Sequence, residues 1–466
     1  MTIGFYGAAR TVTGSKHLIR LDNGCHILLD CGLFQGMGHA TEPLNAHFAF
    51  DAASVHYMIL SHAHIDHCGL LPKLVAEGFR GPVFCTPATM DLARVLMLDS
   101  ARIQEQDSQF ERRHLRPGEA AEEPLYTEDD VLQAVSQMKV VPYGKIHHIN
   151  DALALQFTDA GHILGSAAVH LSIKEHGKET RLSFSGDVGR YNDLLLRAPQ
   201  AFPQADYIIM ESTYGDSLHP AAEPIEQQLY DIIQHTCMVK KGKVVIPAFS
   251  VGRTQELLYT LNALELKHRL PDVAYYVDSP LSIEATKVLK HHTEVYNAEV
   301  RKTLAVDQDV FAFKGLRFIE SAEESKMLNR DKRPCVIISS SGMAEGGRVK
   351  HHIKNTIDDA RNTIVLVGYC EPSSLGGKLA AGEQEVMIFN QSYRVNAEVK
   401  SMRSMSAHGD YADLLRFLSC QHPEQVKGLF LVHGEYHVQQ EFKQHLSAKG
   451  FDNVVIPAFR EEVQLI

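Results

Sequence analysis

The sequence feature that most constrains this chain is a group of metal-binding side chains directly after a mostly apolar segment. His62, His64, Asp66 and His67 follow residues 55–60 and spell H-x-H-x-D-H. Alternate residues of an extended segment point to the same side, so His62 and His64 can share one ion. Asp66 and His67 lie on the turn that follows and can face a second ion. Nitrogen and oxygen ligands of this kind suit zinc. We therefore predict a site for two divalent metal ions at the end of a buried strand.

A histidine-rich surface loop is the alternative interpretation of this motif. Four ligand-type residues within six positions, directly after a predicted strand, favour the metal site over such a loop.

Residues of the same types follow other predicted strands that lie far apart in the sequence. The strands expected at 26–29, 154–158, 181–185 and 429–432 are followed by Asp30, His162, Asp187 and His433. A glycine next to each of the last three permits a tight turn close to a metal ion. We expect the strand ends to meet at one sheet edge and form a single pocket. Taken singly, Asp30 could instead cap a strand end and His433 could be a packed or surface histidine.

The chain resembles the metallo-β-lactamase superfamily, and later motifs place it near the β-CASP branch. That branch contains RNA-processing metallo-hydrolases such as ribonuclease J and the nuclease subunit of the pre-mRNA 3′-end cleavage machinery. The superfamily signatures fall on Asp30, Ser61–His67, His162 and Asp187. The branch signatures fall on Glu211 in Glu-Ser-Thr-Tyr-Gly, His408 in Ser-Ala-His-Gly-Asp and His433 in Val-His-Gly-Glu. The resemblance extends over essentially the whole chain.

The resemblance implies a role for each of these side chains. The first zinc ion would be bound by His62, His64 and His162. The second would be bound by Asp66, His67 and His433, and Asp187 would bridge the two ions. Asp30 would orient a ligand imidazole from behind. Manganese is the alternative metal to zinc.

Such a centre suits the hydrolysis of RNA phosphodiester bonds by a hydroxide activated between the two ions. Asp187, Glu211 and His408 are the catalytic residues that the resemblance implies. His408 would donate a proton to the leaving oxygen or contact the phosphate, and Glu211 would orient it. Glu211 could instead mark the entry to a helix, because Ser212 and Thr213 follow it.

The distribution of ligands along the chain predicts an inserted domain. Between Tyr214 and Met405 no ligand is expected, and predicted strands alternate there with helices, as in parallel α/β sheets. The fold class is therefore α/β: a metallo-β-lactamase αββα sandwich with an inserted β-CASP domain. We expect the sandwich to comprise residues 1–210 and 396–466, and the β-CASP domain residues 211–395.

Turns between strands and helices of the insert are candidate phosphate sites. Ser340, Ser341 and Gly342 form one such turn, and Arg253 carries a guanidinium suited to two-point phosphate contact. Ser340 and Ser341 could instead cap a helix. A solvated basic face is an equally good interpretation of Arg348, His351 and His352.

Composition limits the setting and the partners. The 466 residues contain no apolar stretch near the ~20 residues of a membrane span, and no signal peptide is visible. Eight scattered cysteines form no C-x-x-C pair, which favours reduced thiols and a cytoplasmic location. A net charge of −11 argues against simple coating of a duplex, so RNA binding would depend on local positive charge and on the metals.

The expected partner is single-stranded RNA, with no membrane, and analogy with the family allows a homodimer. Three other functions are weighed against the ribonuclease: a thioester or lactone hydrolase, a DNA-directed nuclease, and a non-catalytic RNA-binding subunit. The insert, Glu211 and His408 argue against the first. The filled ligand positions argue against the last. Internal cleavage and 5′→3′ trimming both remain open.

Overall fold

The computed structural model describes residues 1–114, 123–219, 224–368, 370–402 and 406–465, and the chain divides into two compact units. Residues 1–218 and 408–466 form the first, here called the sandwich unit. Residues 219–407 form the second, here called the insert unit.

Two segments decide where the chain passes from one unit to the other. After strand β11 (Tyr207–Glu211), the Ser212 hydroxyl donates to the Val432 carbonyl 2.7 Å away and so stays with the sandwich unit. Strand β19 (Glu398–Met402) pairs with β16 (Thr363–Val367) and so belongs to the insert unit. The compact units divide after 218 and 407, while domain limits after 210 and 395 stay a prediction from sequence.

The first sheet of the sandwich unit has seven strands. In sheet order they are β22 (Glu462–Gln464), β1 (Thr2–Phe5), β2 (His17–Arg20), β3 (His26–Leu29), β4 (Tyr57–Ile59), β5 (Val83–Cys85) and β6 (Met138–Val140). The strands from β22 to β3 are antiparallel, and those from β3 to β6 are parallel. β4 is the strand predicted to precede the histidine motif.

The second sheet also has seven strands. In sheet order they are β21 (Val454–Val455), β20 (Gly428–Val432), β11 (Tyr207–Glu211), β10 (Lys178–Phe184), β9 (Ala167–Glu175), β8 (Leu153–Asp159) and β7 (His147–Asn150). β21, β20, β11 and β10 run parallel, so their carboxyl ends meet at one edge of the sheet. β10, β9, β8 and β7 are antiparallel.

The two sheets share one apolar core. Ile3 and Phe5 of β1 enter it from the first sheet, and Phe157 and Phe184 of β8 and β10 enter it from the second. Side chains along β8 alternate at its start, with Leu153 and Leu155 buried and their neighbours partly exposed, as a half-buried strand requires. Two facing sheets with interdigitated inner faces form the inner layers of a sandwich.

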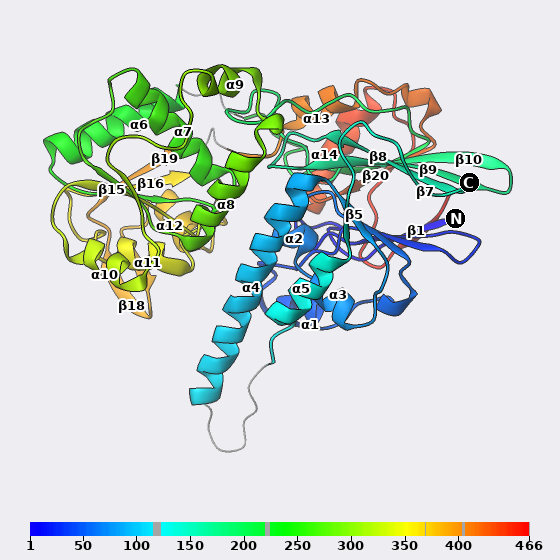
Figure 1. Ribbon diagram of the computed structural model, residues 1–466, viewed down its shortest axis with the longest axis horizontal. Helices are drawn as coiled ribbons and strands as arrows, with labels where there is room; N and C mark the ends of the chain where they lie inside the picture. The colour runs from blue at the N-terminus through cyan, green and yellow to red at the C-terminus, as the bar shows by residue number, and fades with distance from the viewer. Residues whose placement is uncertain (115–122, 220–223, 369, 403–405, 466) are drawn as a thin grey trace. The chain divides into compact units, whose positions relative to one another are not determined.

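Helices cover the outer faces of both sheets (Figure 1). α13 (Tyr411–Leu418) and α14 (Tyr436–Ser447) pack on the second sheet through a separate apolar cluster that includes Phe417, Phe442 and Leu431. On the side of the first sheet lie α1 (Thr41–Ala46), α2 (Ile65–Cys68), α3 (Leu71–Ala76), α4 (Pro87–His114) and α5 (Glu128–Ser136). The sandwich unit therefore has the predicted αββα layers.

Helix α4 runs into the polar stretch at residues 99–135, which is rich in Glu, Gln and Arg. Its buried residues lie mainly between Ala88 and Ala101, and Ser108 is the one buried side chain described beyond them. The second half of α4 therefore lacks the apolar stripe that reveals an amphipathic helix in a sequence. Residues 115–122 of the same stretch lie outside the described residues.

The insert unit is built on a six-stranded sheet in which every described pair is parallel. The sheet order is β14 (Leu316–Phe318), β13 (Ala274–Val277), β15 (Cys335–Ser339), β12 (Val244–Pro247), β16 (Thr363–Val367) and β19 (Glu398–Met402). β12, β15 and β16 are buried along their whole length, because a parallel sheet is covered on both faces.

The helices of the insert unit follow its strands in alternation. They are α6 (Ile225–Ile233), α7 (Arg253–Leu266), α8 (Pro280–His291), α9 (Ala298–Leu304), α10 (Ala322–Arg330), α11 (Gly347–Lys354) and α12 (Leu375–Ala380). Figure 1 shows α6 and α7 on one side of the sheet and α10 and α11 on the other. A hairpin of β17 (Glu385–Ile388) and β18 (Gln391–Arg394) completes the unit. The predicted fold class, a sandwich with a parallel α/β insert, is confirmed.

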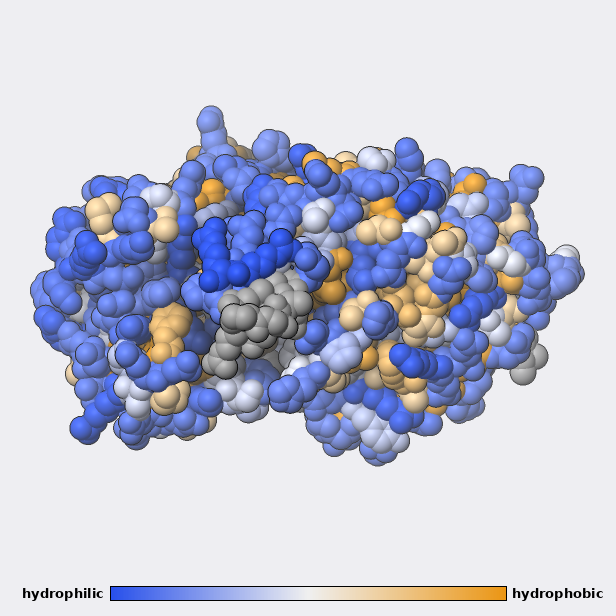
Figure 2. All heavy atoms as spheres, turned by 90° about the horizontal axis from the view of Figure 1, so that it is seen from below, coloured by the Kyte–Doolittle hydropathy of each residue, from blue (hydrophilic) through white to orange (hydrophobic). Residues whose placement is uncertain are grey.

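Hydrophilic residues cover most of the face shown in Figure 2, and apolar residues appear there in scattered groups. Of the helices described, none combines the length and the apolar character that crossing a bilayer requires.

Candidate metal centre

The histidine motif begins where β4 ends. The chain continues in extended form through His62 to His64, which is the N-cap of the one-turn helix α2. Asp66 and His67 lie on that turn. The change from extended chain to helix directs the first pair of ligands and the second pair to different places, as the motif spacing predicts.

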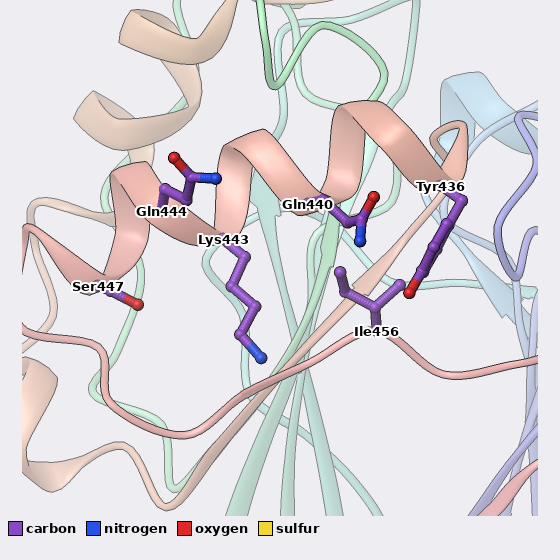
Figure 3. A pocket seen from close by; sticks show the side chains of 6 residues that line it. All are labelled: Tyr436, Gln440, Lys443, Gln444, Ser447 and Ile456. Carbon is purple, nitrogen blue, oxygen red and sulfur yellow. The ribbon is translucent and has the colours of Figure 1, made fainter.

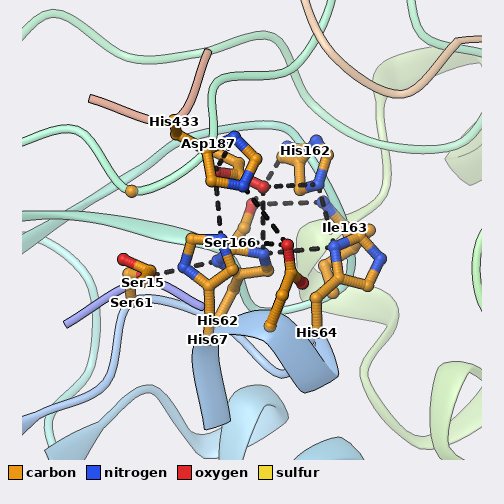
Figure 4. A network of polar contacts seen from close by, with 12 residues as sticks. Ser15, Ser61, His62, His64, His67, His162, Ile163, Ser166, Asp187 and His433 are labelled. Carbon is orange, nitrogen blue, oxygen red and sulfur yellow. Dashed lines mark hydrogen bonds and ion pairs between the residues drawn. The ribbon is translucent and has the colours of Figure 1, made fainter. Parts of the chain in front are cut away.

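One cluster of possible ligands contains His62, His64, His162 and Asp187, with one donor atom from each lying within 4.8 Å of the others (Figure 4). His64 Nδ1 is 3.2 Å from His62 Nε2 and 3.1 Å from His162 Nε2. Asp187 Oδ2 is 3.4 Å from His62 Nε2 and 3.5 Å from His162 Nε2. A tetrahedral zinc ion with bonds of about 2.0–2.1 Å needs donor atoms about 3.3 Å apart, so the spacing fits.

A second cluster contains Asp66, His67 and His433. His433 Nε2 lies 3.3 Å from Asp66 Oδ2, and His67 Nε2 lies 3.9 Å from the same oxygen. Asp187 Oδ1 is 3.2 Å from His67 Nε2 and 3.6 Å from His433 Nδ1. The two oxygens of Asp187 thus face different clusters, which is the arrangement of a bridging carboxylate.

Burial and charge also suit cations at this place. His67 Nε2 and Asp187 Oδ1 are buried and make no hydrogen bond within the described residues. Buried polar atoms without hydrogen bonds are costly unless another partner, such as a metal ion, satisfies them. Burial by itself lowers the pKa of His67. The carboxylates of Asp187, Asp66 and Asp30 outweigh this effect and raise the pKa of His67 well above its ordinary value. The site therefore has a negative potential that divalent cations would neutralise.

The protonation states of His62 and His64 also suit metal binding. Burial, followed by repulsion from His67, lowers the pKa of His62 to about 3, so its imidazole stays neutral near pH 7. Burial lowers the pKa of His64 and the Asp66 carboxylate raises it, and the net result is a pKa of about 4. Metal ions bind neutral imidazole, so these two side chains need lose no proton to bind one.

Asp30 lies behind the second cluster. It is fully buried, and its carboxylate accepts hydrogen bonds from the Ser61 amide and hydroxyl, both at 2.8 Å. Its Oδ2 lies 2.7 Å from His67 Nδ1, which leaves Nε2 of that ring directed at the cluster. This is the geometry of a residue that orients a ligand imidazole. Asp30 and His433 both have left-handed φ values, 57° and 49°, which turn the chain sharply at the strand ends.

His408 and Glu211 meet beside the first cluster. Glu211 Oε1 is 3.2 Å from His408 Nδ1, and His408 Nε2 is 3.9 Å from Asp187 Oδ2. Glu211 is fully buried and also accepts a hydrogen bond from the Val188 amide at 2.5 Å. Burial lowers the pKa of His408, but Glu211 and then Asp187 outweigh it and raise this pKa to about 9. The imidazole can thus hold a proton close to the metal ligands at neutral pH.

Sequence reasoning missed one side chain of the centre. Thr213 Oγ1 lies 3.0 Å from His433 Nδ1 and donates to the His433 carbonyl at 3.1 Å, so Thr213 holds the His433 side chain in place. The signal that could have identified Thr213 is its place in the Glu-Ser-Thr-Tyr-Gly motif, two residues after Glu211.

The predicted phosphate-binding residues lie in the insert unit. Arg253 is buried, with 6% of its surface exposed, and its guanidinium forms an ion pair with Glu256. The Ser340 hydroxyl donates to Ser279 Oγ at 2.8 Å, and Ser341 and Gly342 follow it. Helix α11 begins only at Gly347, so these residues form a loop before the helix, and the Ser340 carbonyl accepts from the first-turn amide of Val349 at 3.4 Å.

Two of the three residues left open on α11 are bound to one carboxylate. Arg348 Nη1 and His352 Nε2 each lie 2.6 Å from an oxygen of the buried Asp278. These two residues therefore form an internal network, which differs from both earlier interpretations. His351 lies with its ring 4.6 Å from that of Phe389.

The fold and the two ligand clusters together define a metallo-hydrolase of the β-lactamase type. Three family models match the chain: a metallo-β-lactamase superfamily domain at residues 18–180, a β-CASP domain at 254–379, and a Zn-dependent metallo-hydrolase RNA specificity domain at 392–457. The chain belongs to the β-CASP family of RNA-processing metallo-hydrolases, as its motifs predict.

Named relatives agree with this membership. Ribonuclease TTHA0252 of Thermus thermophilus is 36% identical over 435 residues, which are 93% of each chain. An RNase J-like protein of Methanocaldococcus jannaschii is 30% identical over 94% of this chain and 93% of its own length. Transcription termination factor FttA of the same organism is 31% identical over 93% of this chain but only 67% of its own length.

Proposed function

We propose that this protein is a ribonuclease that hydrolyses RNA phosphodiester bonds with two zinc ions, in RNA processing or decay. The observation that carries the proposal is the position of Asp187 between two ligand clusters, with the His408–Glu211 pair next to it. The relatives named as ribonuclease and RNase J-like protein support the choice of substrate.

In this proposal, the first ion would be held by His62, His64 and His162, and the second by Asp66, His67 and His433. Asp187 would serve both ions. Two divalent ions, when bound, supply an activated water and positive charge for the phosphoryl oxygens. Nitrogen-rich ligation favours zinc, and manganese is the alternative. Asp30 and Thr213 keep the His67 and His433 rings oriented.

The proton for the leaving oxygen comes from His408. Its Nδ1 faces Glu211, and its Nε2 lies on the side of Asp187, where the substrate would bind. The raised pKa keeps the imidazole protonated at neutral pH, and the same charge would attract a phosphate oxygen. Glu211 acts through His408 by holding the ring.

We further propose that the substrate is single-stranded RNA and that the Ser340–Gly342 loop contacts a phosphate. A phosphate contact by Arg253 would require its ion pair with Glu256 to open. A homodimer is proposed by analogy with the family.

The proposal is tested with one RNA labelled at the 5′ end in one sample and at the 3′ end in another. Matched DNA, a thioester and a lactone serve as alternative substrates. Zinc-dependent RNA cleavage that Asp187→Ala abolishes is expected, and the two labels separate internal cuts from trimming at an end. Asp151→Ala, a change at an exposed turn, is the matched control and should cut normally. Hydrolysis of the thioester or lactone without RNA cleavage would contradict the proposal.

The role of His408 is tested with His408→Gln and Glu211→Gln. Loss of a general acid reduces the rate by about 10²–10⁴-fold, and we expect His408→Gln to fall in that range. Glu211→Gln should reduce the rate less, because the amide can still accept from the ring. An RNA with a good leaving group at the cut site should recover activity in His408→Gln. No recovery would favour phosphate contact over proton donation.

A further inference from the structure

A groove along helix α14 is not used by any of the roles assigned above. It is lined by Tyr436, Gln440, Lys443, Gln444 and Ser447 of α14 and by Ile456, and its volume is about 660 Å³. Figure 3 shows Tyr436, Gln440 and Lys443 projecting from α14 on the side of the segment that carries Ile456.

The groove begins close to the metal centre. Tyr436 follows the ligand His433 by three residues, and three residues span at most about 11 Å. The loop at residues 8–11 is hydrogen-bonded to the segment between the metal centre and the groove. The Ala8 carbonyl accepts from the His433 amide at 2.7 Å, and the Thr11 carbonyl accepts from the Gly434 amide at 3.2 Å.

Arg10 of this loop lies at the edge of the groove, where it contacts two of the lining residues. Its guanidinium lies 4.6 Å from the centre of the Tyr436 ring and donates to the Ile456 carbonyl at 3.2 Å. These contacts hold an exposed cation at the end of the groove nearest the metal ligands.

The charge of the groove is positive, although the whole chain carries −11. Lys443 lies in the groove, Arg10 at its edge, and no carboxylate is among the residues that line it. Glu435, at the start of α14, lies 3.4 Å from His437. Neither Arg10 nor Lys443 forms an ion pair within the described residues. Both cations are therefore available to an anionic partner.

The shape and the other side chains suit a single strand. The lining residues of α14 recur at spacings of three and four, so they form one stripe, about 16 Å long at 1.5 Å per residue. Tyr436 is 44% exposed, and an exposed aromatic ring is a platform on which an unpaired base can stack. Gln440 and Gln444 add amides that can hydrogen-bond to base edges or sugars.

We propose that this groove binds the single-stranded RNA segment next to the bond that is cut. Tyr436 stacks on a base, and Arg10 and Lys443 contact phosphates. The inference rests on the proposed ribonuclease function and names how the substrate is held. The groove lies within the residues matched by the RNA specificity model.

Binding is measured in the Asp187→Ala background, so that cleavage does not interfere. The probe is a fluorescein-labelled 12-nucleotide RNA of mixed sequence, followed by anisotropy over a series of salt concentrations, with the same RNA as a duplex for comparison. The variants are Tyr436→Ala, Tyr436→Phe, Lys443→Glu and Arg10→Ala. Lys178→Glu is the matched charge control, because Lys178 is exposed at the start of β10, about 20 Å along the strand from its Asp187 end.

Tyr436→Ala should weaken binding of the single strand roughly 5- to 150-fold, the usual value of one stacked base, while Tyr436→Phe keeps the ring and the affinity. Lys443→Glu and Arg10→Ala should each weaken binding and reduce the slope of log K against log salt by about 0.7. Lys178→Glu should change neither. Binding of the duplex should depend little on Tyr436.

Unchanged affinity in Tyr436→Ala and Lys443→Glu would overturn the inference and make a protein partner the occupant to examine. An equal loss for duplex and single strand would overturn the stacking role. If the unmodified protein cuts no RNA but these variants still lose affinity, the ribonuclease proposal fails and the groove assignment stands.

Discussion

At the scale of single residues, three imidazoles of the centre are each held by a contact to their Nδ1 atom. His62 Nδ1 lies 3.0 Å from Ser61 Oγ, His67 Nδ1 contacts Asp30, and His433 Nδ1 contacts Thr213. Each contact leaves the other nitrogen of the ring directed at a cluster. Orientation from behind the ligands usually matters to a metal site nearly as much as the ligands themselves.

His170 shows how strongly burial acts on an imidazole that lacks a carboxylate neighbour. Its ring nitrogens lie 2.8 Å from Thr158 Oγ1 and 2.9 Å from Ser183 Oγ, and the ring stacks on Phe202. Burial alone lowers the pKa of His170 to about 3. The unfolded chain, with a pKa of about 6.5, therefore binds a proton more readily than the folded one.

This difference predicts an acid-dependent loss of stability. The contribution of His170 is fully present above pH 6.5 and is lost as the pH falls towards 3, at about 1.4 kcal/mol per pH unit. Between pH 7 and 5.5, His170→Gln should lose about 1 kcal/mol less unfolding free energy than the unmodified chain. Urea unfolding of metal-free protein, with hydrogen exchange followed in β8 to β10, measures this difference. An equal loss in both proteins would contradict it.

At the scale of elements, two strand ends and one helix start determine the position of His408. The Val188 amide donates to Glu211, the Val188 carbonyl accepts from the Gly409 amide at 2.8 Å, and Gly189 forms a β-bridge with His408. Helix α13 starts directly afterwards, capped by Asp410, whose carboxylate accepts from the Ala412 and Asp413 amides at 3.0 and 3.1 Å.

Asp410→Ala should therefore destabilise the start of α13 by about 1 kcal/mol, the usual cost of losing an N-cap. Hydrogen exchange in residues 408–418 should accelerate, and cleavage should slow because His408 loses its support. Asp410→Ser retains a capping oxygen and should restore slow exchange. Fast exchange in the serine variant would show that Asp410 acts in some way other than capping.

At the scale of the whole molecule, every predicted metal ligand lies in the sandwich unit. The ligands come from four places in the sequence, residues 62–67, 162, 187 and 433, and bound ions would join them. The insert unit has its own apolar core, which includes Val245, Ile364 and Leu366. Metal binding should therefore stabilise one unit and not the other.

Metal removal tests this division of stability. A ligand present at 100 times its Kd adds about 2.7 kcal/mol to the unit that binds it. Chelator treatment should accelerate exchange around residues 62–67, 162, 187 and 433 and leave β12, β15 and β16 unchanged, and added zinc should reverse the effect. Equal acceleration in both units would show that the ions stabilise more than the sandwich unit.

Much of this centre could be predicted from sequence because its signals are local. The apolar run before His62, the i, i+2 spacing of His62 and His64, and the ligand-type residues at other strand ends depend only on neighbouring residues. Alternation of strands and helices predicted the parallel sheet of the insert unit for the same reason. The resemblance to β-CASP proteins then connected Glu211 with His408, which are 197 residues apart.

Only the tertiary structure decided how side chains from distant segments share their polar atoms. It directs the two oxygens of Asp187 to different clusters, holds His433 with Thr213, and binds Arg348 and His352 to Asp278. It also places β19 in the insert sheet and extends α4 beyond its apolar stripe. The sequence by itself determined which residues could bind metal, because that depends on residue type and local spacing. Their partners depend on long-range packing, which leaves no periodic pattern in a single chain.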